Sequence, residues 1–133
     1  MTTQITLPKI KFYTTRYASQ DINNLKPLLG SLDTMLVDVR FSPIGSDMMR
    51  WRKIYLKALL REKYQHISQL GSRAGRNQIQ NLDLGIKILI SFNANVVLMC
   101  ECDDQKECHR ILIVQELRRK GFEAEELEDW KLG

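Results

Sequence analysis

The run VVLMC at residues 96–100 is the most strand-like stretch of the chain. It is apolar without interruption, which is typical of a strand buried on both faces of a parallel sheet. The run MLVDVR at residues 35–40 has the same character, with one acid inside it and one base at its end. Two such runs predict a sheet whose central strands are covered by helices on both sides.

Outward from these runs, strands and helices alternate about five times. Further strands are expected at KIKFYT (9–14), YQHI (64–67) and FEAEEL (122–127), the last at an edge of the sheet. Helices are expected over residues 21–30, 51–63, 77–92 and roughly 105–120. This alternation predicts an α/β fold, a three-layer sandwich with a mainly parallel five-stranded sheet. A length of 133 residues fits one domain, so residues 1–133 are taken as a single α/β domain.

Helix ends are predicted from residue types that favour caps and turns. Pro27 would distort the first helix unless that helix starts late. In the second helix, Ile54, Ala58 and Leu59 share one face. The expected end residues are Asp21 (N-cap) and Gly30 (stop) for the first helix, Asn77 (N-cap) for the third and Gly121 (stop) for the fourth.

Composition indicates an ordinary globular protein, with 44% hydrophobic and 27% charged residues. No run approaches 18 apolar residues, and the first residues lack the layout of a signal peptide. We therefore expect a cytoplasmic protein with no membrane association. Three cysteines lie within nine residues, and without a secretory signal they do not suggest a disulfide framework.

Charge is distributed unevenly along the chain. Residues 40–76 carry nine Lys or Arg against two acids, and residues 101–129 carry ten acids against five bases. The basic region keeps nucleic-acid binding as an alternative function. The aromatic residues Trp51, Tyr55 and Tyr64 are expected in or near the core rather than as platforms for stacking bases.

The segment CECDDQKECHR at residues 100–110 combines thiol, imidazole and guanidinium groups. Asp104 and Glu107 have the spacing of a capping box, which would place Cys108, His109 and Arg110 in the first turns of a helix. The start of a helix favours anions and lowers the pKa of a nearby thiol.

Three interpretations of this segment stay open. A zinc site would use Cys100, Cys102, Cys108 and His109, but this spacing fits no common zinc pattern. A nucleophilic thiol would be Cys100, with His109 as acid or base. A non-covalent site would hold an anion between Arg40 and Arg110, whose planar guanidinium groups suit phosphate or carboxylate.

Asp38 is a carboxylate inside an apolar strand, so it needs a cationic or hydrogen-bonding partner. Arg40 lies on the same side of the strand by the period of two. Asp38 either holds an Arg or His of a site in place or forms a purely structural ion pair. His66 follows Tyr64 in the YQHI strand and is a further candidate acid or base.

Several of these residues resemble the domain of unknown function 488 family. The resemblance rests on VDVR at 37–40, on Tyr64-x-His66 followed by Leu70–Gly71, and above all on Cys100 followed by Cys108–His109–Arg110. It implies a small α/β domain and brings no established reaction. Family members often carry a Gly-His-Ser step where this chain has Thr15–Arg16–Tyr17, and a glutamate where it has Cys102.

The leading hypothesis is a pocket for a small anionic ligand, such as a nucleotide or phosphorylated metabolite, at the carboxyl end of the sheet. The candidate catalytic residues are Cys100, His109 and His66, and the candidate ligand-binding residues are Arg40, Arg110, Asp38 and Cys108. The alternatives are a cysteine-based redox or metal-binding module and a non-catalytic nucleic-acid-binding protein. No cofactor is specified, and whether a reaction follows binding is left open.

Overall fold

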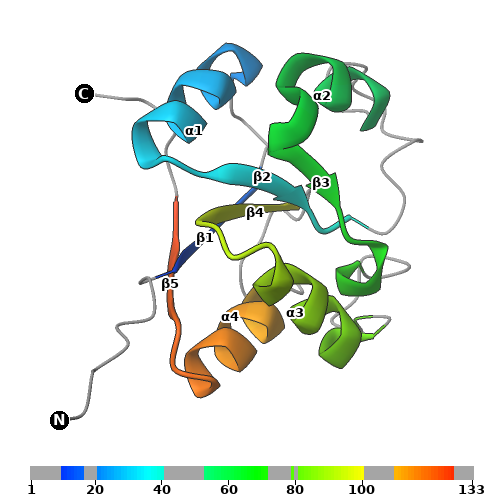
Figure 1. Cartoon of the computed structure of the whole chain (residues 1–133), viewed down its shortest axis with the longest axis vertical. Helices are drawn as coiled ribbons and strands as arrows, with labels where there is room; N and C mark the ends of the chain where they lie inside the picture. Colours follow the sequence, from blue (N-terminus) through cyan, green and yellow to red (C-terminus); the bar gives the residue numbers. More distant parts are fainter. Residues whose placement is uncertain are drawn as a thin grey trace, which may run out of the picture.

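A five-stranded sheet forms the centre of the fold. The computed structural model describes residues 10–16, 21–40, 53–71, 79, 81–100 and 110–127, apart from the side chains of Arg16, Cys100 and Arg110. The strand order is β3 (Tyr64–His66), β2 (Met35–Asp38), β4 (Val96–Cys100), β1 (Lys11–Arg16) and β5 (Glu123–Glu126), and each neighbouring pair runs parallel (Figure 1). The predicted parallel sheet is therefore confirmed.

The two apolar runs of the sequence become the central strand and its neighbour. Leu36 and Val37 point to opposite faces of the sheet and are both fully buried, because helices cover each face. The first strand begins two residues later than predicted.

Helices cover the sheet in two layers (Figure 1). On one face lie α1 (Leu25–Leu32) and α2 (Lys53–Leu60), and on the other lie α3 (Leu82–Ser91) and α4 (Arg110–Arg119). The three-layer sandwich is confirmed. Short 3-10 turns accompany them: η1 (Ile22–Asn24), η4 (Arg61–Lys63) and η5 (Ser68–Leu70). No helix in the described ranges has the length and apolarity needed to cross a membrane.

Each face of the sheet has its own apolar core. The α1/α2 side buries Tyr13, Ile22, Leu25, Leu28, Leu29, Leu36, Leu56, Leu60, Tyr64, Val97 and Met99. The α3/α4 side buries Phe12, Val37, Val39, Ile67, Leu70, Ile86, Leu89, Val96, Leu98, Ile113, Leu117 and Ala124.

Of three predicted helix ends, one is confirmed, one caps a 3-10 turn instead of the helix, and one is wrong. The Asp21 carboxylate accepts a hydrogen bond from the backbone N–H of Asn23 at 2.9 Å, but as the N-cap of η1, because α1 itself begins late, at Leu25. Gly121 has φ +93°, and its N–H donates to the Arg118 carbonyl at 3.0 Å, which closes α4. Gly30 does not end α1, which continues to Leu32 and is followed by Asp33 in the left-handed conformation. An aspartate takes the position expected of glycine because it tolerates this conformation.

The starting point of α3 differs from the prediction. The helix begins at Leu82, and the N-cap is Asn81, whose side chain accepts from Leu84 N–H at 3.2 Å. Asn77 itself lies outside the described residues. The apolar repeat extends upstream of the helix because Ile79 packs on the same core from outside it. Continuous periodicity therefore did not mark the helix boundary.

The buried face of α2 also differs from the prediction. Leu56 and Leu60 are buried against the sheet, whereas Ile54 is 79% exposed and Ala58 is exposed. Both candidate faces of this helix are apolar, so periodicity alone did not identify the buried one.

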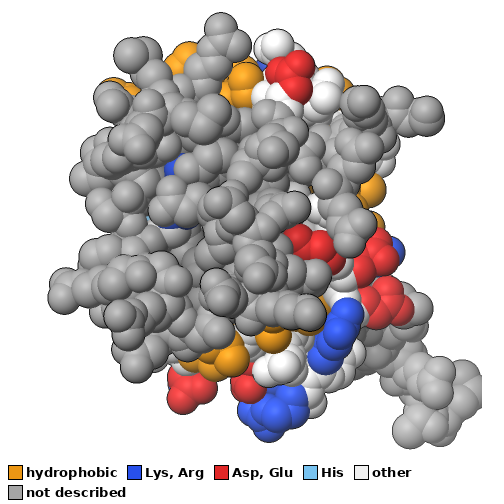
Figure 2. Space-filling view, turned by 180° about the vertical axis from the view of Figure 1, so that it is seen from behind, with side chains coloured by type: hydrophobic (Ala, Val, Ile, Leu, Met, Phe, Trp, Pro, Cys, Tyr) orange, Lys and Arg blue, Asp and Glu red, His pale blue; other side chains and the backbone are white. Residues whose placement is uncertain are grey.

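Charges of both signs mix at the surface near β5 and α4. Figure 2 shows acidic and basic side chains on this side of the molecule. Lys11 pairs with Glu125 at 3.3 Å, and Arg119 pairs with Glu116. Such exposed ion pairs contribute little to stability.

Candidate functional site

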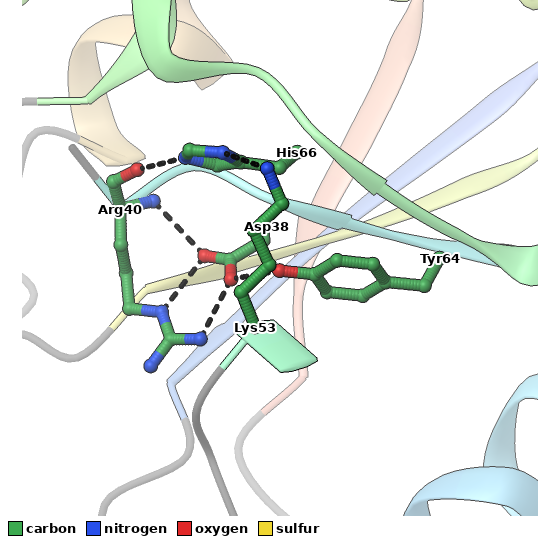
Figure 3. A network of polar contacts seen from close by, with 5 residues as sticks. All are labelled: Asp38, Arg40, Lys53, Tyr64 and His66. Carbon is green, nitrogen blue, oxygen red and sulfur yellow. Dashed lines mark hydrogen bonds and ion pairs between the residues drawn. The ribbon is translucent and has the colours of Figure 1, made fainter. Parts of the chain in front are cut away.

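A buried polar network lies at the carboxyl end of β2 (Figure 3). Asp38 Oδ1 accepts from the Arg40 backbone N–H at 3.1 Å and from Arg40 Nε at 2.8 Å. Its Oδ2 accepts from Arg40 Nη2 at 2.6 Å and from the Tyr64 hydroxyl at 2.6 Å. The carboxylate is fully buried, and these donors offset the cost of removing its charge from water.

Arg40 is held by this network on the inside of the molecule. Its side chain is 3% exposed, and it meets Asp38 through the two-donor geometry that suits guanidinium and carboxylate. The predicted partnership between Asp38 and an arginine is therefore present. Nε and Nη2 of Arg40 both donate hydrogen bonds to Asp38, so these described contacts are structural.

Tyr64 joins the network from β3. Burial raises the pKa of its phenol above the ordinary value near 10, and the neighbouring Asp38 carboxylate raises it further. The hydroxyl consequently stays protonated and remains a hydrogen-bond donor to Asp38. β3 lies beside β2 in the sheet, with Asp38 in register with His66.

His66 connects the network to the surface. Its Nε2 lies 2.7 Å from the Arg40 carbonyl oxygen, and its Nδ1 lies 3.4 Å from Lys53 Nζ. A carbonyl can only accept, so this contact assigns the hydrogen to Nε2, and Nδ1 of the neutral ring is then the acceptor facing Lys53. Figure 3 shows the Arg40 carbonyl oxygen facing the imidazole, and this contact sets the orientation of the ring.

A pocket of about 310 Å³ opens beside His66 and Lys53. We call it the His66 pocket; it is lined by Lys53, Lys57, Arg61, Glu62, Tyr64, Gln65 and His66. Three permanent cations face one carboxylate in this lining, a formal balance of +2. The positive side chains come from α2 and from the turn that follows it.

Arg61 adopts an uncommon backbone conformation, with φ +54°. Left-handed backbone is unfavourable for a long side chain, and such residues occur more often near functional sites. Here the conformation lies at the junction of α2 with η4, where the chain turns into β3. Arg61 forms part of the wall of the His66 pocket.

The structure brings together three of the seven predicted site residues: Asp38, Arg40 and His66. Cys100 ends β4, in register with Arg16 of β1, but its side chain lies outside the description. Arg110 is the first residue of α4, and its side chain is likewise not described. The predictions for Cys108 and His109 fall on residues 101–109, outside the described residues.

Sequence reasoning missed the cations of the His66 pocket. Lys53, Lys57 and Arg61 follow one another at intervals of four, which would place them along one side of a helix. That spacing was a usable signal, hidden within the general excess of positive charge. Tyr64 was expected only as a core residue, and its hydroxyl contact with Asp38 depends on the pairing of β2 with β3.

Among the described residues, no group of three His, Cys, Asp or Glu side chains could hold a metal ion. Neither family models, nor curated proteins, nor solved structures yield a match to this chain.

Proposed function

We propose that this protein binds a small anionic ligand, of the phosphate or phosphorylated-metabolite class, in the His66 pocket. The observation that carries the proposal is the gathering of Lys53, Lys57 and Arg61 around one hollow beside His66. A volume of about 310 Å³ lies at the lower end of the range for small-molecule pockets. The ligand is therefore small, and its charge is opposite to that of the pocket wall.

Each cation has a distinct part in this proposal. Lys57 and Arg61 are exposed and can approach the anion with little loss of internal contacts. Lys53 lies within reach of His66, so it would divide its hydrogen bonds between the ring and the ligand. Arg61 can present two parallel N–H groups to phosphate oxygens.

His66 supplies the polar specificity of the pocket. With its hydrogen held on Nε2 by the Arg40 carbonyl, Nδ1 can accept from a ligand hydroxyl or from a protonated phosphate oxygen. An acceptor held in one orientation is also what general-base chemistry requires. If a reaction follows binding, His66 would be the proton acceptor.

The Asp38–Arg40–Tyr64 network acts through His66 rather than on the ligand. It fixes the backbone of Arg40, whose carbonyl oxygen orients the imidazole at 2.7 Å. In this proposal Asp38 and Arg40 are positioning residues, which differs from the direct anion contact expected for Arg40 from the sequence. Because the network already holds the imidazole in place, ligand binding does not have to order the ring.

We further infer kinship with the domain of unknown function 488 family. The support is that three matching residues, Asp38, Arg40 and His66, are not scattered but form one connected network. The prediction is that a structure of a family member has the same Asp–Arg pair beside its strand histidine. A member in which these residues lie apart would remove this support.

Titration calorimetry with inorganic phosphate and a nucleoside monophosphate tests the binding proposal. Lys57→Gln should weaken binding roughly tenfold, the effect of losing one charge-assisted hydrogen bond of about 1.5 kcal/mol. Lys87→Gln is the matched control, because Lys87 is an exposed lysine on α3 in the opposite helix layer. Equal affinities for the two variants would mean that the anion binds elsewhere.

Two outcomes would favour the alternatives. Stoichiometric zinc in the purified protein would support the metal-binding module. Tight binding of a random-sequence oligonucleotide that weakens steeply with salt, without binding of phosphate, would support nucleic-acid recognition through residues 40–76.

A further inference from the structure

A groove separates α1 and α2 on the outer side of their layer. Two hollows of about 590 and 420 Å³ lie between these helices, and both are lined by Lys26 and Leu59. We call them together the α1/α2 groove. It shares only Arg61 and Glu62 with the described lining of the His66 pocket.

The floor of the groove is largely apolar. Ile22, Pro27, Tyr55 and Leu59 line its smaller hollow, and Tyr55 is 40% exposed. Ile22 belongs to the α1/α2 core and Leu59 packs against it, so the floor adjoins this core, and Pro27 and Tyr55 extend it to the surface. An apolar floor with polar side chains around it is the usual layout of a protein–protein interface.

The charges around this floor have one predominant sign. Lys26 lies where the two hollows meet, and Arg61 and Lys63 line the larger hollow together with Glu62. Three cations against one acid leave the described lining with a formal balance of +2. An occupant must therefore carry apolar groups toward the floor and negative groups toward the rims.

We propose that the α1/α2 groove binds an acidic amphipathic helix of a partner protein. A hollow between two helices accepts a third helix that inserts a row of apolar side chains, spaced three and four residues apart. Acidic side chains beside this row would meet Lys26 and Arg61. Charge complementarity of this kind selects the partner and steers its approach.

A nucleic acid fits the same groove less well. Single-stranded nucleic acids bind through successive aromatic platforms, and Tyr55 is the one aromatic residue in the described lining. The remaining floor is aliphatic, which suits leucine-like side chains of a peptide. The observations therefore favour a protein partner.

Fluorescence anisotropy with the full-length protein and labelled synthetic peptides tests this proposal. The probe is a helical peptide with leucines along one face and glutamates along the other; its partner probe has lysines in place of the glutamates. The acidic peptide should bind, and the basic peptide should bind at least tenfold more weakly. A labelled mixed-sequence single-stranded oligonucleotide serves as the third probe.

Variants assign the binding to the groove. Tyr55→Ala should weaken binding of the acidic peptide roughly tenfold, as removal of a central aromatic anchor does. Lys26→Glu should weaken it by a similar factor. The matched controls on α3 are Leu84→Ala, which removes a 43% exposed apolar side chain, and Lys87→Glu; both should leave affinity unchanged.

Three results would overturn the proposal: no binding of the acidic peptide, equal binding of both peptides, or binding insensitive to Tyr55→Ala and Lys26→Glu. Preferred binding of the oligonucleotide at the groove would also overturn it. Neither variant residue lines the His66 pocket, so phosphate binding should be unchanged in both. The two proposals can therefore fail independently.

Discussion

Replacing Tyr64 by phenylalanine tests whether the buried network stabilises the fold. The Tyr64 hydroxyl donates to Asp38 Oδ2 at 2.6 Å, and this carboxylate is fully buried. Phenylalanine keeps the ring that packs in the α1/α2 core and removes only the donor. A hydrogen bond to a charged group contributes about 1.5 to 3 kcal/mol. We therefore expect the free energy of unfolding to fall by about 2 kcal/mol.

The same substitution should change the dependence of stability on pH. The pKa of Tyr64 is raised in the folded protein, so above about pH 10 the unfolded chain loses this proton first. Stability from the protonated phenol is complete below that pH and is lost as pH rises toward the folded-state pKa. The wild-type protein should lose about 1.4 kcal/mol per pH unit more than Tyr64→Phe in this range.

Chemical denaturation followed by circular dichroism measures both effects. Tyr55→Phe is the matched control, because Tyr55 is partly exposed and its substitution should change stability by less than about 0.5 kcal/mol. The reasoning would be refuted if Tyr64→Phe were as stable as this control at neutral pH. It would also be refuted if the two variants had the same pH dependence above pH 10.

Three further substitutions test other parts of the structure by the same denaturation assay. Asp38→Ala leaves the Arg40 charge buried without its carboxylate and should cost about 3 to 5 kcal/mol; replacing both residues by leucine should recover part of this loss. Gly30→Ala should stabilise the protein by up to about 1 kcal/mol, because Gly30 is exposed within α1 and an added Cβ meets no atom within 4 Å. Gly85→Ala should destabilise it by about 1 to 3 kcal/mol, because the added Cβ would lie 2.5 Å from Leu70 Cγ. The packing described would be contradicted by an unchanged free energy of unfolding in Asp38→Ala or Gly85→Ala. A lower free energy of unfolding in Gly30→Ala would contradict it as well.

Much of the candidate site was not predictable from the sequence. A cationic partner for Asp38 was predicted, and Arg40 was expected on the same side of the strand, because residues two apart in a strand point the same way. The contact between Lys53 and His66 was not, because it joins α2 to β3 across a turn whose path depends on Arg61. Likewise, the spacing of Ile54 and Ala58 indicated that this face of α2 is buried, but the buried residues of the helix are Leu56 and Leu60.

Local patterns were sufficient for the architecture of this protein. The apolar runs VVLMC and MLVDVR marked the central strand β4 and its neighbour β2, and cap chemistry located Asp21 and Gly121. Each of these features depends on neighbours within a few residues. The strand order and the orientation of the helices were decided only by the tertiary structure. They depend on which apolar faces pack against each other and so exclude water. That step placed Tyr64 against Asp38 and His66 against Arg40, and it gathered the cations of α2 and η4 around one pocket. Contacts between residues far apart along the chain have no local pattern from which they can be read.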